Sequence, residues 1–325
     1  MEKRKLGLQG LEVSALGYGC MGLSHAYGTA LDERIAVQRI HEAYDSGYTF
    51  FDTAEVYVGK FKDGTPAINE EVVGKALSSL RGKVLIATKG GLSWEGKNTI
   101  PDGSRASIRK SVENSLRRLG IDVIDLYYQH RQDESVEAES VAETMSELID
   151  EGKIRYWGIS NASLEYILRA DKVCKVSAVQ LRYSMMARKS ELMFPALDER
   201  GIGVVAYSPI ANGFLSGDIK TSDQYDKEHD FRSFMPQYQK EEIAKSAVLL
   251  DTITRLGEEK NATPAQISLA WMLNKKSFIV PIPGTTKLER IKENAQSANV
   301  VLSATEIQSL DEALDGLDLR VFGGV

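Results

Sequence analysis

Eight apolar runs of strand length follow one another along the chain, and amphipathic segments of helix length separate them. The runs lie at 15–19, 49–52, 84–88, 124–128, 156–159, 178–180, 203–207 and 279–282. Between them, apolar residues recur three and four positions apart, the spacing of one helix face, at 33–45, 69–80, 107–119, 136–151 and 163–174. This alternation predicts a parallel sheet whose strands are connected by helices.

The number of strand–helix units favours a closed barrel over an open sheet. The chain has 325 residues and no linker rich in Pro or Ser, so we expect residues 1–325 to form a single (β/α)₈ TIM barrel domain. The alternating pattern at 3–14 predicts an N-terminal β-hairpin, and an extra helix is expected at the C-terminus. Capping-box patterns that begin at Thr263, Thr286 and Ser303 predict three late helix starts.

Composition narrows the class of protein. The 40 Lys and Arg residues against 46 Asp and Glu residues give a net charge of −6, which argues against a protein that coats nucleic acid or an anionic membrane. No uncharged apolar run approaches the ~20 residues of a spanning helix. Cys20 and Cys174 are the two cysteines, and the histidines outside the predicted strands match no metal-binding spacing. We therefore expect a cytoplasmic protein without a metal site.

Polar residues gather where the predicted strands end. In a (β/α)₈ barrel these ends converge on one mouth, where active sites lie. A strand end in solvent also attracts polar residues, so each one alone is uninformative. The residues at the ends of the second to eighth strands are Asp52, Lys89, His130, Ser160, Asn161, Gln180, Tyr207, Ser208, Gly284 and Thr285.

Three of these residues have chemistry that complements that of Tyr57, which lies on the loop after the second strand. They are Asp52, Lys89 and His130. An unpaired charge in a partly dry mouth is costly, so Asp52 and Lys89 are expected to pair. The Lys89 ammonium is then expected to lower the pKa of Tyr57 from its usual value of about 10, which makes the phenol a better proton donor. A neutral His130 would add a second hydrogen bond to a carbonyl oxygen that gains negative charge.

Several motifs at these positions resemble the signatures of the aldo-keto reductase superfamily. They are residues 52–57 (DTAEVY), 87–89 (ATK), 125–130 (DLYYQH) and 158–161 (GISN), and the match extends over nearly the whole chain. Residues 127–131 and 206–209 are similar to the branch that holds microbial and plant reductases and potassium-channel β-subunits. The resemblance implies that Asp52, Tyr57, Lys89 and His130 form a catalytic tetrad with Tyr57 as the general acid.

The resemblance also implies a nicotinamide cofactor. Ser160, Asn161 and Gln180 would hold its carboxamide, and Tyr207 would stack on its ring. Lys287, Arg290, Glu293 and Asn294 would bind the adenosine end, and a cation beside a 2′-phosphate implies NADPH/NADP⁺. Bland interpretations remain open: Asn161 could cap the helix near Ser163, and the two cations could form a solvated helix face. Gly284 stands where many relatives carry lysine, and residues 210–213 depart from a Gly-Arg-Gly-like run.

The expected function is the NADPH-dependent reduction of an aldehyde or ketone to an alcohol. Two alternatives remain: a redox-sensing protein of the channel β-subunit kind with slow turnover, and an oxidative enzyme acting on sugars or alcohols. Residues 58–67, 92–94 and the long irregular segment after Ser208 are expected to line the substrate pocket, with Trp94 as a pocket wall or a loop anchor. The physiological substrate, the direction of reaction and the oligomeric state stay open.

Overall fold

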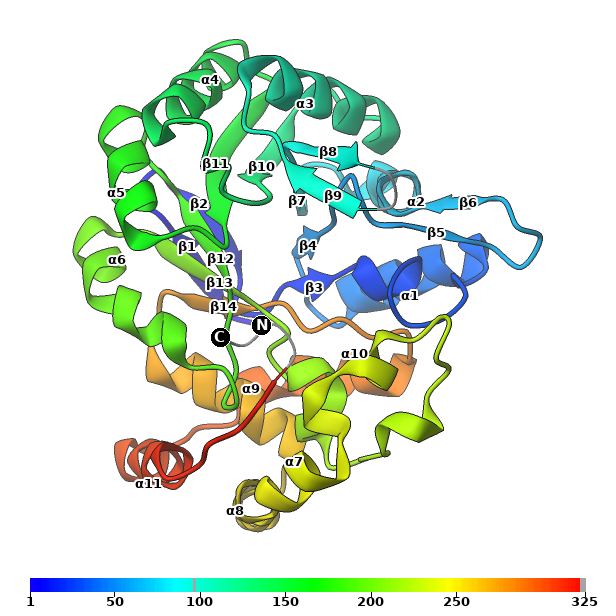
Figure 1. Ribbon diagram of the computed structural model, residues 1–325, viewed down its shortest axis with the longest axis vertical. Helices are drawn as coiled ribbons and strands as arrows, with labels where there is room; N and C mark the ends of the chain where they lie inside the picture. The colour runs from blue at the N-terminus through cyan, green and yellow to red at the C-terminus, as the bar shows by residue number, and fades with distance from the viewer. Residues whose placement is uncertain (96–97, 322–325) are drawn as a thin grey trace.

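Eight parallel strands form the centre of the computed structural model, which describes residues 1–95 and 98–321 (Figure 1). The edge strands close on each other through backbone bonds from Gly17 N–H to Pro281 O (2.9 Å) and from Gly19 N–H to Pro283 O (3.3 Å). The predicted (β/α)₈ barrel is therefore confirmed. Its strands are β3 (Tyr18–Gly19), β4 (Phe50–Asp52), β7 (Leu85–Gly90), β10 (Ile124–Gln129), β11 (Ile154–Ser160), β12 (Ala178–Arg182), β13 (Gly203–Tyr207) and β14 (Ile279–Pro281).

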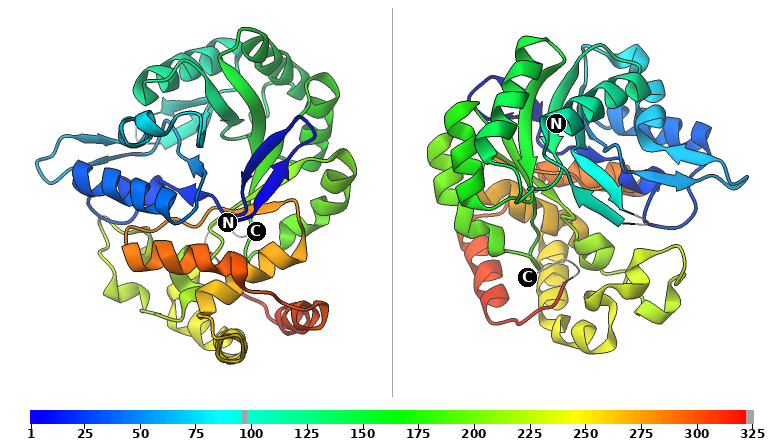
Figure 2. Two further views of the ribbon diagram at one scale, coloured as in Figure 1. Left: turned by 180° about the vertical axis from the view of Figure 1, so that it is seen from behind. Right: turned by 45° about the horizontal axis from the view of Figure 1, so that its top comes forward.

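Helices surround the strands, and both further views show this outer layer (Figure 2). Side-chain caps fix several helix starts: Asp32 accepts the N–H of Arg34, and Ser163 accepts that of Tyr166, which leaves Asn161 free of a capping role. The helices are α1 (Glu33–Asp45), α2 (Asn69–Leu77), α3 (Arg105–Leu119), α4 (Ala138–Asp150), α5 (Leu164–Val173), α6 (Phe194–Arg200), α7 (Lys240–Lys245), α8 (Ala247–Lys260), α9 (Pro264–Lys275), α10 (Leu288–Gln296) and α11 (Ala304–Asp315).

The N-terminal hairpin closes one end of the barrel. Strands β1 (Lys3–Leu6) and β2 (Leu11–Ser14) pair antiparallel, as the sequence predicts. Their apolar side chains Leu6, Leu11 and Val13 pack in one cluster with inward residues of the strands, such as Phe50 and Leu126. This end is filled with apolar side chains, and because the strands are all parallel, their polar C-terminal ends meet at the opposite mouth.

The capping box predicted at Thr286 is not formed. Lys287 is the N-cap of α10 and makes no side-chain cap bond, while the Thr285 hydroxyl accepts the N–H of Lys287 at 3.2 Å. The helix therefore starts at Leu288, later than the sequence pattern indicates. The two other boxes, at Thr263 and Ser303, are present.

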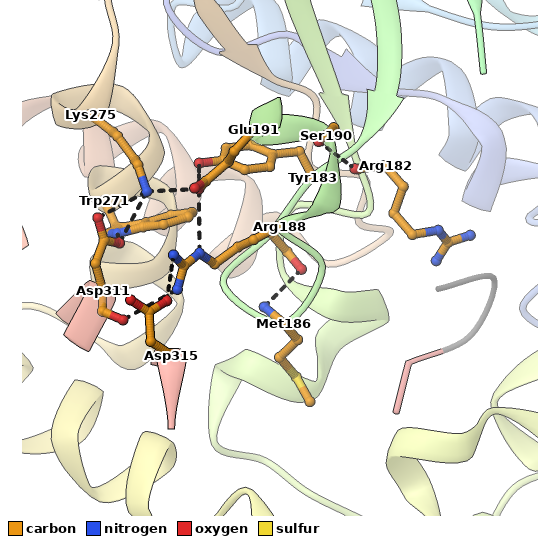
Figure 3. A network of polar contacts seen from close by, with 11 residues as sticks. Arg182, Tyr183, Met186, Arg188, Ser190, Glu191, Trp271, Lys275, Asp311 and Asp315 are labelled. Atoms are coloured by element: carbon orange, nitrogen blue, oxygen red, sulfur yellow. Dashed lines mark hydrogen bonds and ion pairs between the residues drawn. The ribbon is translucent and has the colours of Figure 1, made fainter. Parts of the chain in front are cut away.

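The C-terminal helix α11 is joined to the barrel by a network of charged groups (Figure 3). Lys275 of α9 contacts Glu191 at 2.7 Å and Asp311 of α11 at 3.0 Å. The indole N–H of Trp271 donates to the same Asp311 at 2.9 Å. The network fixes the extra helix that the sequence predicts against the outer layer. No helix within the described part of the chain is long and apolar enough to cross a membrane.

Candidate active site

A cavity of about 740 Å³ lies at the polar mouth of the barrel. Every predicted site residue except Lys89 lines it, although these residues come from segments far apart in sequence. The lining residues among them are Asp52, Tyr57, His130, Ser160, Asn161, Gln180, Tyr207, Ser208, Gly284, Thr285, Lys287, Arg290, Glu293 and Asn294.

Lys89 lies behind the cavity surface and holds two groups that line it. It is fully buried at the end of β7, and its Nζ donates to Asp52 Oδ1 at 2.5 Å, Thr53 O at 2.7 Å and Tyr57 Oη at 3.3 Å. Burial disfavours the ammonium, but the charges and hydrogen bonds of Asp52 and Tyr57 together outweigh this effect and raise the pKa of Lys89 above its usual value. The expected ion pair between Asp52 and Lys89 is present, and Lys89 stays charged.

The pKa of Tyr57 shifts opposite to the sequence-based expectation. Burial raises the pKa of the Tyr57 phenol and outweighs the opposing effect of Lys89. The expectation of a net lowering is therefore wrong, because the sequence shows the nearby cation but not the depth at which the ring lies. Tyr57 remains protonated near neutral pH, so its hydroxyl is available as a donor.

His130 lies beside Tyr57 at the mouth, and the two ring centroids are 6.1 Å apart in an edge-on arrangement. Burial, with the charges of Lys89 and Arg131, lowers the pKa of His130 well below its usual value. Its imidazole is therefore neutral, as the sequence argument assumed. A neutral ring offers one N–H donor without adding charge to the site.

Amide and hydroxyl groups line the wall next to this cluster. The Tyr207 hydroxyl donates to Asn161 Oδ1 at 2.8 Å, and Asn161 Nδ2 donates to Ser160 Oγ at 2.8 Å. Asn161 has a φ of 51°, a left-handed conformation that asparagine tolerates better than most residues. Gln180 Nε2 donates to Asp52 Oδ2 at 2.7 Å, so this wall is connected directly to the ion pair.

The long segment after Ser208 lines the cavity, as expected, through short 3₁₀ turns. The turn Ala211–Ser216 contains left-handed residues at Asn212 (φ 62°) and Gly213 (φ 99°). Asn212 Nδ2 donates to the hydroxyl of Tyr27 at 2.8 Å, and a bridge pairs Tyr27 with Asp230. The sequence does not single out Tyr27 as a site residue, since an aromatic residue in an irregular loop carries no periodic signal.

The other predicted pocket segments do not reach the cavity. Residues 58–67 contribute to a hairpin of β5 (Val58–Lys60) and β6 (Pro66–Ile68), and residues 92–94 lie in a hairpin of β8 (Leu92–Glu95) and β9 (Asn98–Pro101). Trp94 is 64% exposed and does not line the cavity. The expectation that these segments form the pocket wall is wrong, because each loop pairs with itself and turns outward.

The opposite end of the cavity carries cations and exposed side chains. Lys287 and Arg290 line it from the start of α10, and Arg290 Nη2 donates to Asp218 Oδ2 at 3.2 Å. Glu293 accepts a 2.5 Å bond from the Thr263 hydroxyl, and Asn294 is buried on the same helix. A helix N-terminus with two nearby cations favours an anion.

The comparisons with known proteins agree on one family. A sequence model described as the aldo/keto reductase family matches residues 15–315. The chain is 41% identical over 321 residues to "Probable aldo-keto reductase 1" from Glycine max, a match covering 95% of this chain and 88% of that protein.

Solved structures give the same result. The glycerol dehydrogenase from Gluconobacter oxydans has a TM-score of 0.86 at 27% identity, covering 97% of this chain and 96% of that one. An aldo-keto reductase from Bacillus halodurans in its holo form has a TM-score of 0.77 at 29% identity, covering 99% and 98%. The chain therefore belongs to the aldo/keto reductase family. Members of this family are oxidoreductases that reduce carbonyl groups with a nicotinamide cofactor.

The residues around the cavity fit such a cofactor. Tyr207 presents a flat aromatic ring, and the neighbouring amide and hydroxyl groups supply both donors and acceptors for a carboxamide. At the other end, the amide N–H groups of Thr285 and Thr286 donate to no acceptor within the described residues. Free N–H groups beside Lys287 and Arg290 match the needs of a phosphate.

Proposed function

We propose that this protein is an NADPH-dependent reductase that converts an aldehyde or ketone to an alcohol, with Tyr57 as the general acid. The observation that carries the proposal is the position of Lys89, whose ammonium touches both Asp52 and the Tyr57 hydroxyl at the cavity. We also propose a cytoplasmic location. The chain has only two cysteines, which fits a reducing compartment.

Tyr57 is proposed to deliver the proton to the carbonyl oxygen. Burial keeps the phenol protonated until the substrate oxygen gains negative charge, and Lys89 then stabilises the phenolate that remains. Asp52 balances the ammonium, which prevents an isolated charge from lying in the wall. The neutral His130 is proposed to donate a second hydrogen bond and orient the carbonyl.

The cofactor is proposed to lie along the cavity from Tyr207 to Arg290. When bound, its nicotinamide supplies the hydride that reduces the carbonyl carbon. Ser160, Asn161 and Gln180 are proposed to hold the carboxamide, and Ser208, Gly284 and Thr285 to line its path, all as cavity residues. The preference for NADPH over NADH is supported by Lys287 and Arg290, which place positive charge at the adenosine end.

The test is the loss of reduced-nicotinamide absorbance when purified protein is mixed with NADPH or NADH and a panel of aromatic, aliphatic and dicarbonyl compounds. Wild-type turnover should be faster with NADPH, and Tyr57→Phe should lower it by about 10²- to 10⁴-fold, the usual contribution of a general acid. NADPH affinity of the variant should stay within a few fold. Tight NADPH binding without turnover on every substrate would instead indicate a sensing role.

A further inference from the structure

The connection between β14 and α10 has two differently bonded faces. Residues 283–287 line the cavity on one side. On the other side, the Tyr18 hydroxyl donates to Thr285 O at 2.5 Å, and Arg39 Nε donates to Thr286 O at 2.9 Å. Tyr18 belongs to β3 and Arg39 to α1, and neither lines the cavity. The first strand–helix unit of the barrel therefore fixes the last connection from outside.

These two bonds determine where the next amide groups point. In a trans peptide, the C=O of one residue and the N–H of the following residue point in opposite directions. Since the carbonyls of Thr285 and Thr286 face Tyr18 and Arg39, the N–H groups of Thr286 and Lys287 face the cavity side. The Lys287 N–H bonds to Thr285 Oγ1 at 3.2 Å, whereas the Thr286 N–H donates to no acceptor within residues 1–95 and 98–321.

Both donors are themselves held in place. Tyr18 is 1% exposed, and its ring packs edge-on against Tyr48 with centroids 5.9 Å apart. Burial raises the pKa of Tyr18 well above its usual value, so the hydroxyl keeps its proton. Arg39 is oriented by a 2.5 Å contact with Glu42 one helical turn later. Rigid donors of this kind lower the cost of ordering the connection when a ligand binds.

We propose that Tyr18 and Arg39 are positioning residues that preorganise residues 285–287 to receive a phosphate of the cofactor's adenosine half. Neither side chain lines the cavity, and they act by turning backbone carbonyls out of the cavity and an amide N–H into it. The inference rests on the proposed function, because it takes the ligand at this end to be NADPH.

The experiment compares Tyr18→Phe with a matched control, Tyr48→Phe. Tyr48 is an equally buried neighbour whose hydroxyl donates to Ile291 O of α10 at 3.4 Å rather than to residues 283–287. Affinities are measured for NADPH, for 2′,5′-ADP as the adenosine half and for reduced nicotinamide mononucleotide as the other half. Tyr18→Phe should weaken NADPH and 2′,5′-ADP about three- to tenfold and leave the mononucleotide unchanged, while Tyr48→Phe should change none of them.

A second variant, Arg39→Lys, keeps the positive charge but loses the geometry of the bond to Thr286 O, and it should give the same split between the two halves. Equal weakening by Tyr18→Phe and Tyr48→Phe, or equal weakening of both cofactor halves, would show a general structural effect and overturn the proposal. Unchanged 2′,5′-ADP affinity in Tyr18→Phe and Arg39→Lys would overturn it as well. If the wild-type protein binds NADPH and reduces carbonyls, either of these results refutes the positioning role and leaves the proposed function intact. If the wild-type protein binds neither half of the cofactor, the proposed function and the positioning role are both refuted.

Discussion

The two ends of the cavity are constructed in different ways. At one end, Asp52 and Lys89 stand on adjacent strands, are 2% and 0% exposed, and contact each other directly. At the other end, Arg290 stands on a helix with 35% of its side chain exposed, and its partner Asp218 is 66% exposed. Buried charges act strongly on neighbouring groups, whereas exposed charges are screened by water and salt. From this difference we propose that the buried end performs the chemistry and that the exposed end provides affinity for the cofactor.

The largest effect is expected from breaking the buried ion pair. Lys89→Met would leave Asp52 without its cation, which typically costs about 3–5 kcal/mol of stability, and it would also lower turnover by about 10²-fold or more. In the double variant Asp52→Asn/Lys89→Met, the free energy of unfolding should largely return while turnover stays low. Denaturant unfolding and steady-state assays on both proteins measure this. Substantial activity in Lys89→Met would remove Lys89 from the mechanism.

The second prediction concerns Glu55, which lies between Asp52 and Tyr57 in the sequence. Burial raises its pKa from 4.5 to about 7, although the Ser111 hydroxyl donates to it at 3.1 Å and Arg118 lies nearby. Because the folded state then binds the proton more tightly, this group lowers stability as pH rises from about 4.5 to 7, by up to about 3 kcal/mol.

Glu55→Gln should therefore match wild type near pH 5 and be more stable near pH 8. The exposed Glu71→Gln serves as the control and should follow the wild-type pH dependence. Thermal and denaturant unfolding across this pH range are the measurements. An identical pH dependence of stability in wild type and Glu55→Gln would show that burial does not raise the pKa of Glu55.

At the exposed end, Arg290→Ala should weaken NADPH about tenfold and NADH much less, because it removes the charged hydrogen bond that we propose Arg290 makes to the 2′-phosphate. Turnover at saturating NADPH should remain. The dissociation constants of both cofactors, measured by fluorescence titration, decide the matter. Equal weakening of NADPH and NADH would refute the role assigned to Arg290.

The smallest effect is expected for Asp218→Asn. Asp218 bonds to the Arg290 guanidinium and would compete with the phosphate proposed to bind there, so its neutralisation should tighten NADPH binding about two- to threefold, the range of exposed ion pairs. The gain should shrink in high salt. Titrations at low and high ionic strength test this, and weaker NADPH binding by Asp218→Asn would indicate that Asp218 itself supports the cofactor.

The sequence predicts the parts of the molecule that depend on local pattern. Strand–helix alternation gives the barrel, and residues placed at strand ends, such as Asp52 and Gln180, do meet at one mouth. The ion pair of Asp52 and Lys89 follows from the cost of an unpaired buried charge. These features are set by residue type and chain order, which a sequence contains.

Features that depend on packing depth or on loop pairing could not be predicted. The pKa of Tyr57 rises because its ring is buried, and no neighbouring residue in the sequence indicates that depth. The contact between Tyr27 and Asn212 joins two irregular loops that are distant in the chain. The sequence has a capping pattern at Thr286, but α10 starts later, at Leu288. The carbonyls of Thr285 and Thr286 instead accept hydrogen bonds from Tyr18 and Arg39.

The most direct test of this division of roles between the two ends of the cavity compares Tyr57→Phe with Arg290→Ala. Both variants are assayed for turnover at saturating NADPH and for NADPH affinity. Tyr57→Phe is expected to lose turnover with NADPH affinity within a few fold of wild type, and Arg290→Ala is expected to lose affinity with turnover retained. Near wild-type turnover in Tyr57→Phe would contradict the account.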